Sequence, residues 1–272
     1  MFMNITDLPQ YRPLHKIQKG GLTDLYVCTN SEGKRVVVRF VKEQHRKDKS
    51  IIKSFKKGLV NLQKFDSPGI IKVLDTGTCK GFQYMVIQYH NSENLRECIL
   101  HQNPILKTNS LTFVRKLAES INYIHNQGYL HMDLKPENIL IKEEGDLILI
   151  DFDFCIPHKG PKPIKLKVLP GTPTYLAPET LKAKEVDERS EVFSFGVIAY
   201  ELLTHHKPFE ANSITEYKRA VADPRVKAYP LHERRGDISK RLEGVIEKCL
   251  AKRKEERYPS MALVLRDLEA LL

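Results

Sequence analysis

The sequence lacks the features that mark membrane-spanning and secreted proteins. None of its uncharged apolar runs approaches the roughly 18 residues that a membrane-spanning helix needs. Its first residues, Met-Phe-Met-Asn-Ile-Thr-Asp, contain no basic stretch that leads into an apolar one, as a secretory signal would. We therefore expect a protein with no membrane span.

Cysteine is sparse and irregularly placed. Five cysteines occur in 272 residues, and no two have the spacing of a metal site or a redox pair: Cys28, Cys79, Cys98, Cys155 and Cys249. An odd, scattered set argues against a disulfide framework and favours a reducing compartment. The expected location is therefore cytoplasmic.

Acidic residues are fewer than basic ones, and the imbalance is local. The chain has 44 Lys and Arg against 34 Asp and Glu, which gives a net charge of +10. Residues 34–57 alone hold ten basic and two acidic residues, and no acidic residue lies between Asp48 and Asp66. The apolar fraction of 41% and the charged fraction of 29% are typical of a globular protein with a substantial core.

The first part of the chain is rich in strand patterns. Strands are expected at residues 24–28, 35–41, 70–74 and 82–89, with turn residues at 30–33 between the first two. Residues 50–65 follow a helical period, with Ile51, Phe55, Leu59 and Leu62 on one face and lysines off it. This part therefore predicts a small sheet with one helix.

After residue 100 helical patterns dominate. Helices are expected near residues 111–124, 190–204, 214–221, 238–251 and 259–271, with a short strand pair at 139–141 and 147–150. Five of the 15 prolines fall in residues 155–173, which predicts an extended exposed loop. The expected fold class is α+β, a small β-rich lobe followed by a larger α-rich lobe, with the boundary near residues 88–92.

Polar residues that suit phosphoryl transfer follow the predicted long helix. The segment His-Met-Asp-Leu-Lys-Pro-Glu-Asn at 131–138 precedes the strand pair, and Asp-Phe-Asp at 151–153 ends it. Phosphoryl transfer needs a carboxylate that orients the attacking hydroxyl, oxygen ligands for Mg²⁺ and a cation for the developing charge. Asp133, Lys135, Asn138 and Asp151 supply this set. Any one of them alone is ordinary turn chemistry, but their order favours a phosphotransfer site.

These motifs resemble those of the protein kinase family, and the resemblance covers about residues 11–270. Residues 171–179, Gly-Thr-Pro-Thr-Tyr-Leu-Ala-Pro-Glu, resemble the family's segment from the substrate-binding loop to the Ala-Pro-Glu motif. Residues 191–196 resemble the start of its buried central helix, and Arg257 stands where the family pairs an arginine with the glutamate, here Glu179. Aminoglycoside and choline kinases share the His-x-Asp loop but lack these segments. Lys135 and Thr172 resemble serine/threonine rather than tyrosine kinases.

The resemblance implies one bilobal kinase domain over residues 1–272, with an N-lobe at about 11–90 and a C-lobe at about 91–272. It implies ATP and Mg as cofactors and a protein hydroxyl as the substrate. Asp133, Lys135 and Asn138 would be catalytic, and Asn138 and Asp151 would hold the metal. The nucleotide would contact Lys19, Gly20, Gly21, Leu25, Val37, Arg39, Ile87, Gln88, Tyr89 and His90.

Several residues depart from the family's pattern near the nucleotide. The Gly-x-Gly-x-x-Gly loop aligns with residues 18–23, of which only Gly20 matches. Arg39 replaces the lysine that contacts the phosphates, and Gly58 replaces the glutamate that pairs with it, so that ion pair cannot form in its usual way. Asp153 replaces the glycine of Asp-Phe-Gly, either to hold its loop in one state or to add a metal contact.

Two departures concern regulation. Met132 replaces the arginine that receives an activation-loop phosphate in the family, and residues 154–171 contain no Ser, Thr or Tyr. We therefore expect no ordering of this segment by phosphorylation.

Two functions remain open from the sequence. One is an active kinase of low activity, in which Arg39, Lys19 or Lys42 supplies the phosphate cation. The other is a pseudokinase that acts as a scaffold or an allosteric regulator. The lysines at 53, 56, 57 and 64 are either a solvated helix face or a docking surface for an acidic partner protein. Nucleic acid is disfavoured as a partner, because aromatic residues do not interleave with these charges.

Overall fold

The computed structural model describes residues 3–17, 21–142, 145–160, 162–169 and 171–271. The chain forms two units. The first contains the residues up to Asn91 together with Asp151–Asp153, and the second contains Ser92–Ile150 and the residues from Phe154 onward. No helix in the described ranges is long and apolar enough to cross a membrane.

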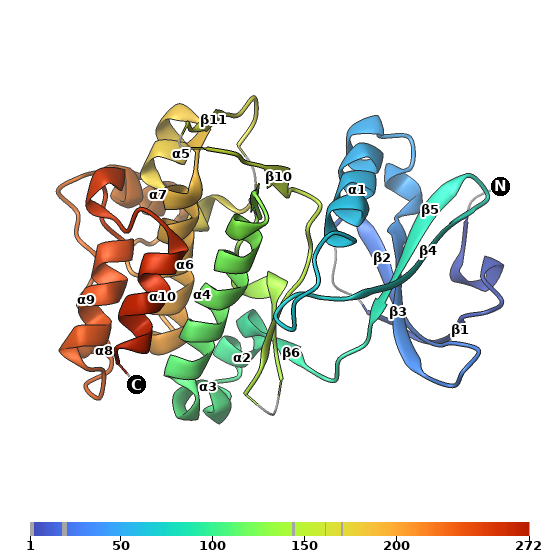
Figure 1. Cartoon of the computed structure of the whole chain (residues 1–272), viewed down its shortest axis with the longest axis horizontal. Helices are drawn as coiled ribbons and strands as arrows, with labels where there is room; N and C mark the ends of the chain where they lie inside the picture. The colour runs from blue at the N-terminus through green and yellow to red at the C-terminus, as the bar shows by residue number, and fades with distance from the viewer. Residues whose placement is uncertain (1–2, 18–20, 143–144, 161, 170, 272) are drawn as a thin grey trace. The chain divides into compact units, whose positions relative to one another are not determined.

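The first unit is built on a five-stranded antiparallel sheet (Figure 1). Its strands are β1 (Arg12–Ile17), β2 (Thr23–Thr29), β3 (Arg35–Val41), β4 (Val73–Cys79) and β5 (Phe82–Gln88), in the spatial order β1-β2-β3-β5-β4. The strand expected at 70–74 overlaps β4 only at its last two residues, because β4 covers Val73–Cys79, while Ile70 forms an isolated bridge and Ile71 lies between the bridge and the strand. Both isoleucines are buried, which accounts for their apolar character.

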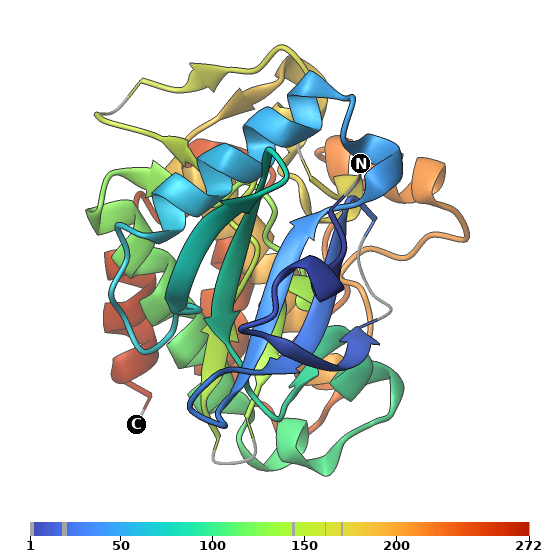
Figure 2. The ribbon, with the colours of Figure 1, turned by 90° about the vertical axis from the view of Figure 1, so that its right-hand side faces the viewer.

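The two faces of this sheet are covered by different segments. The register places Leu25 opposite Arg39 and Val37 opposite Ile87, so these four side chains share one face. Helix α1 (Lys49–Leu62) packs on that face through Phe55. The N-terminal segment, with Met3, Ile5, Leu8 and Tyr11, covers the opposite face and lies in front of the strands in Figure 2.

Helix α1 confirms the helix expected at 50–65. Its N-terminus is capped by Asp48, whose carboxylate accepts hydrogen bonds from the backbone N–H groups of Ser50 and Ile51. Phe55 and Leu59 are buried, whereas Lys53 and Lys56 are exposed. The apolar stripe read from the sequence therefore faces the sheet.

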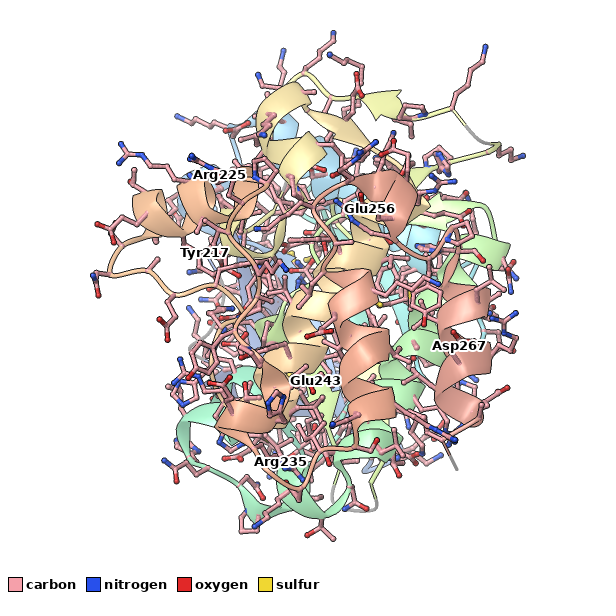
Figure 3. All side chains as sticks on the ribbon, turned by 90° about the vertical axis from the view of Figure 1, so that its left-hand side faces the viewer. Tyr217, Arg225, Arg235, Glu243, Glu256 and Asp267 are labelled. Atoms are coloured by element: carbon pink, nitrogen blue, oxygen red, sulfur yellow. The ribbon has the colours of Figure 1, made fainter. Side chains whose placement is uncertain are left out.

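The second unit is mostly helical. Its helices are α2 (Leu95–Leu100), α3 (Pro104–Thr108), α4 (Ser110–Asn126), α5 (Pro178–Ala183), α6 (Glu188–Thr204), α7 (Ile214–Ala222), α8 (Leu231–Arg234), α9 (Lys240–Cys249) and α10 (Met261–Glu269). Every residue of α6 from Ser190 to Thr204 is buried, so this helix forms the core of the unit. In Figure 3, α9 and α10 lie side by side, and Glu243 of α9 bonds His232.

Short strands join the helices of the second unit. They are β6 (Glu93–Asn94), β7 (Tyr129–Leu130), β8 (Ile139–Ile141), β9 (Leu147–Leu149), β10 (Ile156–Pro157), β11 (Ile164–Lys165) and β12 (Glu185–Val186). The segment expected as an extended exposed loop at 155–173 is not wholly a loop, since β10 pairs with β7 and β11 pairs with β12, and it is not wholly exposed, since His158 is buried. A β-sheet unit and a helical unit confirm the expected α+β class.

Close packing in the second unit generates a prediction for α6. A Cβ atom at Gly196 would lie 2.9 Å from the Cβ atom of Cys249, whereas a Cβ atom at Gly244 of α9 would meet nothing within 4 Å. Gly196→Ala should therefore lower the free energy of unfolding by about 1–2 kcal/mol despite its better helix propensity. The matched Gly244→Ala should raise it by about 0.5–1 kcal/mol. Urea denaturation checks both, and a stabilised Gly196→Ala would contradict this packing.

Candidate active site

Three predicted catalytic residues lie together in the turn between β7 and β8. The ammonium of Lys135 donates to Asp133 Oδ2 at 2.6 Å. The side-chain amide of Asn138 donates to the same oxygen at 3.0 Å and to the backbone carbonyl of Asp133 at 2.9 Å. These contacts fix the orientation of the Asp133 carboxylate.

The second carboxylate oxygen of Asp133 has a different environment. Asp133 is only 4% exposed, and its Oδ1 atom is buried without a hydrogen-bond partner among the described residues. Gly171 approaches it closely, because a Cβ atom there would lie 2.6 Å from Oδ1, and its φ of +54° also suits glycine. A buried acceptor without a donor is costly, so this oxygen is suited to accept a hydrogen bond from a bound hydroxyl.

The buried helix α6 anchors this turn through Glu191. One carboxylate oxygen of Glu191 accepts from the backbone N–H of Met132 at 2.7 Å, and the other bonds His125 Nε2 at 2.8 Å. Burial alone would raise the pKa of Glu191, but the hydrogen bond with His125 and the charges of His125 and His131 outweigh it and lower that pKa. The carboxylate therefore stays ionised at neutral pH.

Met132 takes part in an apolar cluster. It packs with Leu130 and Val186, and three residues of the following segment pack against them: Ile156, Ile164 and Leu166. The strand pairs β7–β10 and β11–β12 hold the same segment. Hydrophobic contacts and backbone pairing thus hold the segment at 154–171, which has no Ser, Thr or Tyr that phosphorylation could use to order it.

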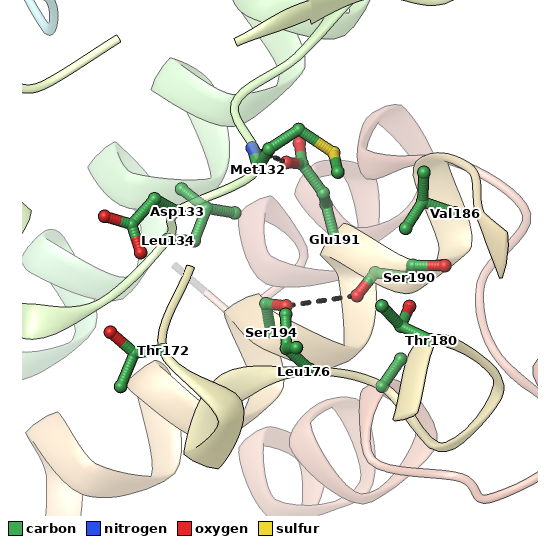
Figure 4. Close-up of a pocket in the computed structure, with 11 residues that line it drawn as sticks. Met132, Asp133, Leu134, Thr172, Leu176, Thr180, Val186, Ser190, Glu191 and Ser194 are labelled. Carbon is green, nitrogen blue, oxygen red and sulfur yellow. Dashed lines mark hydrogen bonds between the residues drawn. The ribbon is translucent and has the colours of Figure 1, made fainter. Parts of the chain in front are cut away.

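A pocket opens beside Asp133 in the second unit. Figure 4 shows Asp133 and Thr172 at one end of it, and the hydroxyls of Thr180 and Ser190 further along. Ser194 Oγ donates to the backbone carbonyls of Tyr175 at 2.8 Å and of Ser190 at 3.2 Å. The lining is a mixture of apolar and hydroxyl side chains close to the candidate base.

In the first unit, Arg39 binds two carboxylates. Its NH1 group donates to Asp153 Oδ1 at 3.1 Å, and its NH2 group donates to Asp153 Oδ2 at 2.8 Å and to Asp151 Oδ1 at 3.3 Å. Its Nε–H donates to Thr23 Oγ1 at 3.1 Å. Burial alone would lower the pKa of Arg39, but the charges of Asp153 and then Asp151 raise it. An ion pair therefore forms at Arg39 although the usual glutamate is missing.

The residues predicted to contact the nucleotide are in part brought together in this unit. Leu25, Val37 and Ile87 share with Arg39 the sheet face described above. Gln88 ends β5 and is exposed, and Tyr89 and His90 follow it as half-buried residues. Gly21 is exposed, whereas Lys19 and Gly20 lie outside the described residues.

The predicted metal ligands have suitable chemistry. Asn138 uses its amide nitrogen on Asp133, so its carbonyl oxygen is the atom it would offer to a cation. Asp151 contributes a carboxylate that is 32% exposed. A carboxylate oxygen and an amide oxygen are each hard donors of the kind that Mg²⁺ prefers, so the chemistry of each residue suits magnesium. Within the described ranges, no three His, Cys, Asp or Glu side chains gather as a further metal site.

A charged cluster in the second unit was not anticipated from the sequence. The carboxylate of Glu201, buried in α6, accepts from Arg96 at 2.7 Å, Lys207 at 2.6 Å and Tyr175 at 2.8 Å. Burial lowers the pKa of Lys207 to about 8 despite the charge of Glu201. These residues are scattered along the chain, and no local spacing signals their association.

The sequence motifs and this geometry agree with what comparison with known proteins finds. A sequence model described as the protein kinase domain matches residues 11–267. The chain belongs to the protein kinase family. As expected for this family from the sequence, Arg257 forms a two-point ion pair with Glu179, with both distances at 2.8 Å.

Several named kinases are similar to this member of the family. It is 28% identical over 258 residues to the serine/threonine-protein kinase PknB of Mycolicibacterium smegmatis. The matched region covers 92% of this chain and 41% of that protein. It is 27% identical over 263 residues to the probable serine/threonine-protein kinase CPE1738 of Clostridium perfringens. That match covers 96% of this chain and 38% of the other protein. The kinase-family chain thus spans about two fifths of the length of these relatives.

The lowered pKa of Glu191 generates a pH-dependent prediction. A carboxyl whose pKa in the folded state lies below its ordinary value of 4.5 contributes stability above that pH and loses it as the pH falls further. Glu191→Gln should therefore lower the free energy of unfolding at pH 7 by about 1–3 kcal/mol. The difference from the wild type should shrink below pH 4.5, as the wild-type carboxyl takes up its proton.

Urea denaturation between pH 7 and pH 4 measures this difference. Glu247→Gln, at an exposed position of α9, is the control and should change stability little at any pH. A loss in Glu191→Gln that stays constant across the pH range would contradict the role of the ionised carboxylate.

Proposed function

We propose that this chain is an ATP- and Mg-dependent serine/threonine protein kinase that transfers the γ-phosphate of ATP to a protein hydroxyl. The observation that carries the proposal is the Asp133 carboxylate, with one oxygen held by Lys135 and Asn138 and the other buried without a partner among the described residues. That second oxygen can accept the proton of an attacking hydroxyl. The named serine/threonine kinases among the relatives support the same reaction class.

The proposal assigns separate roles to the neighbouring residues. Asp133 orients the substrate hydroxyl, and Lys135 balances charge on the transferring phosphoryl group while it holds Asp133. Asn138 and Asp151 would hold magnesium, which when bound neutralises charge on the phosphates. The apolar side chains of Leu25, Val37 and Ile87 offer one surface for the adenine ring, and Gln88, Tyr89 and His90 follow at its edge.

A second candidate function is that of a pseudokinase, a scaffold or allosteric regulator whose nucleotide binding is optional. The observation that favours it is the engagement of Arg39 by Asp153 and Asp151, which ties the candidate phosphate cation to carboxylates. The exposed lysines Lys53 and Lys56 of α1 would suit an acidic partner protein. The compartment that we propose for either function is the cytoplasm, on the cysteine pattern.

Asp133→Asn tests the proposed function. The substitution keeps the shape of the side chain but removes the base, so transfer to a generic basic protein should fall by about 10²–10⁴-fold. The thermal shift on addition of Mg-ATP should remain, because Asp133 is not assigned to nucleotide binding.

Asp237→Asn is the matched control, because Asp237 is 58% exposed and pairs only with Arg235 among the contacts described here. It should transfer phosphate like the wild type. No thermal shift and no transfer in the wild type would overturn the kinase proposal. A thermal shift with Mg-ATP but no phosphate transfer in the wild type would support the pseudokinase. Phosphate transfer by Asp133→Asn at the wild-type rate would refute Asp133 as the base.

A further inference from the structure

The ion pair of Arg39 joins residues that are far apart in the sequence but belong to the same unit. The guanidinium and the Asp153 carboxylate form a two-point contact, and their side chains are each 10% exposed. Asp151 makes a single contact at 3.3 Å, and its side chain is 32% exposed. Asp153 is therefore the principal counter-ion of Arg39, and Asp151 is the more accessible of the two carboxylates.

Helix α1 packs beside this pair but contributes no negative charge to it. The helix contains no Asp or Glu between Lys49 and Leu62. It offers instead the ring of Phe55, whose centroid lies 5.6 Å from the Arg39 guanidinium carbon. The negative charge that a buried guanidinium requires must come from elsewhere in the unit.

Gly58 of α1 provides the space for that charge. A Cβ atom at this position would lie 2.5 Å from Asp153 Oδ1 and 2.8 Å from the Asp153 Cα atom. Any side chain at position 58 would therefore collide with Asp153 and its backbone. Glycine is a poor residue for the interior of a helix, and the close approach of Asp153 accounts for its presence here.

The segment that carries Asp153 is fixed on its other side. Phe152 is 1% exposed, and its ring packs against that of Phe65 at a centroid distance of 5.3 Å. Asp151 has a φ of +64°, an uncommon conformation for a residue with a side chain. The bonds from Arg39 to both flanking carboxylates oppose relaxation of this backbone.

We propose that Asp153 is a positioning residue that fixes Arg39 and, through the shared NH2 group of Arg39, the carboxylate of Asp151. Arg39, Gly58 and Asp153 then depend on one another: the Asp-Phe-Asp segment supplies the carboxylate, and the glycine of α1 makes room for it. The effect on Asp151 rests on the proposed function, in which Asp151 holds magnesium. The pairing itself does not depend on catalysis.

A double-mutant cycle in EDTA and without nucleotide tests the pairing. Asp153→Asn should lower the melting temperature by at least about 5 °C, because a buried guanidinium loses its principal counter-ion. Arg39→Lys keeps the charge but loses the planar fork, so it should lower the melting temperature by less than Asp153→Asn does. The melting temperature of the double variant should fall by clearly less than the sum of the decreases in the two single variants.

Glu32→Gln is the matched control for this cycle. It breaks an ion pair with Lys34 in the same unit, but both side chains are at least 66% exposed. Its melting temperature should stay within about 2 °C of the wild type. Additive losses in the cycle, or an Asp153→Asn variant as stable as the control, would overturn the pairing.

Gly58→Ala tests the space requirement. It should lower the melting temperature although alanine favours helix. The decrease should be smaller in an Asp153→Gly background, where the 2.5 Å contact with Oδ1 is gone. Gly244→Ala in α9 is the control for the same change in a helix with open space. A Gly58→Ala variant that is more stable than the wild type would contradict the arrangement.

Magnesium dependence separates positioning from a purely structural role. If Arg39 and Asp153 orient Asp151, Asp153→Asn should raise the magnesium concentration for half-maximal ATP binding about ten-fold, as loss of an outer-shell partner does. Titration calorimetry with ATP at fixed magnesium concentrations measures it, at a temperature where both proteins are folded. An unchanged magnesium dependence would refute the effect on Asp151.

These outcomes are distinguishable from failure of the proposed function. A wild-type chain that binds no Mg-ATP would refute the proposed function, together with the effect on Asp151, while the cycle in EDTA still tests the pairing. Normal transfer without coupling between positions 39 and 153 would overturn the pairing alone.

Discussion

The buried ion pair between Arg39 and Asp153 is the interaction on which the candidate nucleotide site of the first unit depends. Removing an arginine from water costs several kcal/mol unless good hydrogen bonds compensate for it. Here the fork of the guanidinium meets both oxygens of Asp153, and Thr23 accepts the Nε–H. The pair therefore constrains strand β3, the Asp-Phe-Asp segment and, through the closeness of Gly58, helix α1.

Both units hold their candidate functional residues by contacts that need no phosphorylation. In the second unit, Glu191 binds the backbone of Met132, and the side chain of Met132 packs in an apolar cluster with the segment that follows the candidate site. A kinase that is switched by phosphorylation uses an arginine where this chain has Met132. The first unit thus relies on a buried ion pair within the protein, and the second on a buried carboxylate and apolar packing.

The sequence was sufficient to predict the periodic elements and the turn that carries the candidate base. The apolar stripes of α1 and α4 and the order of Asp133, Lys135 and Asn138 are local signals. The partner of Arg39 could not be read in this way, because Asp153 lies 114 positions further along the chain. The sequence linked the departures at positions 39 and 58 but gave no reason to connect Asp153 with them, and the proposed compensation rests on the proximity of the three residues in space.

The most direct test of the ion pair is a crystal structure of the chain without nucleotide or magnesium. It should show the Arg39 guanidinium within hydrogen-bond distance of both carboxylate oxygens of Asp153, with the Gly58 Cα atom packed against the Asp153 backbone. A guanidinium turned toward solvent, or an Asp153 carboxylate turned away from Arg39 with a gap beside Gly58, would contradict the account.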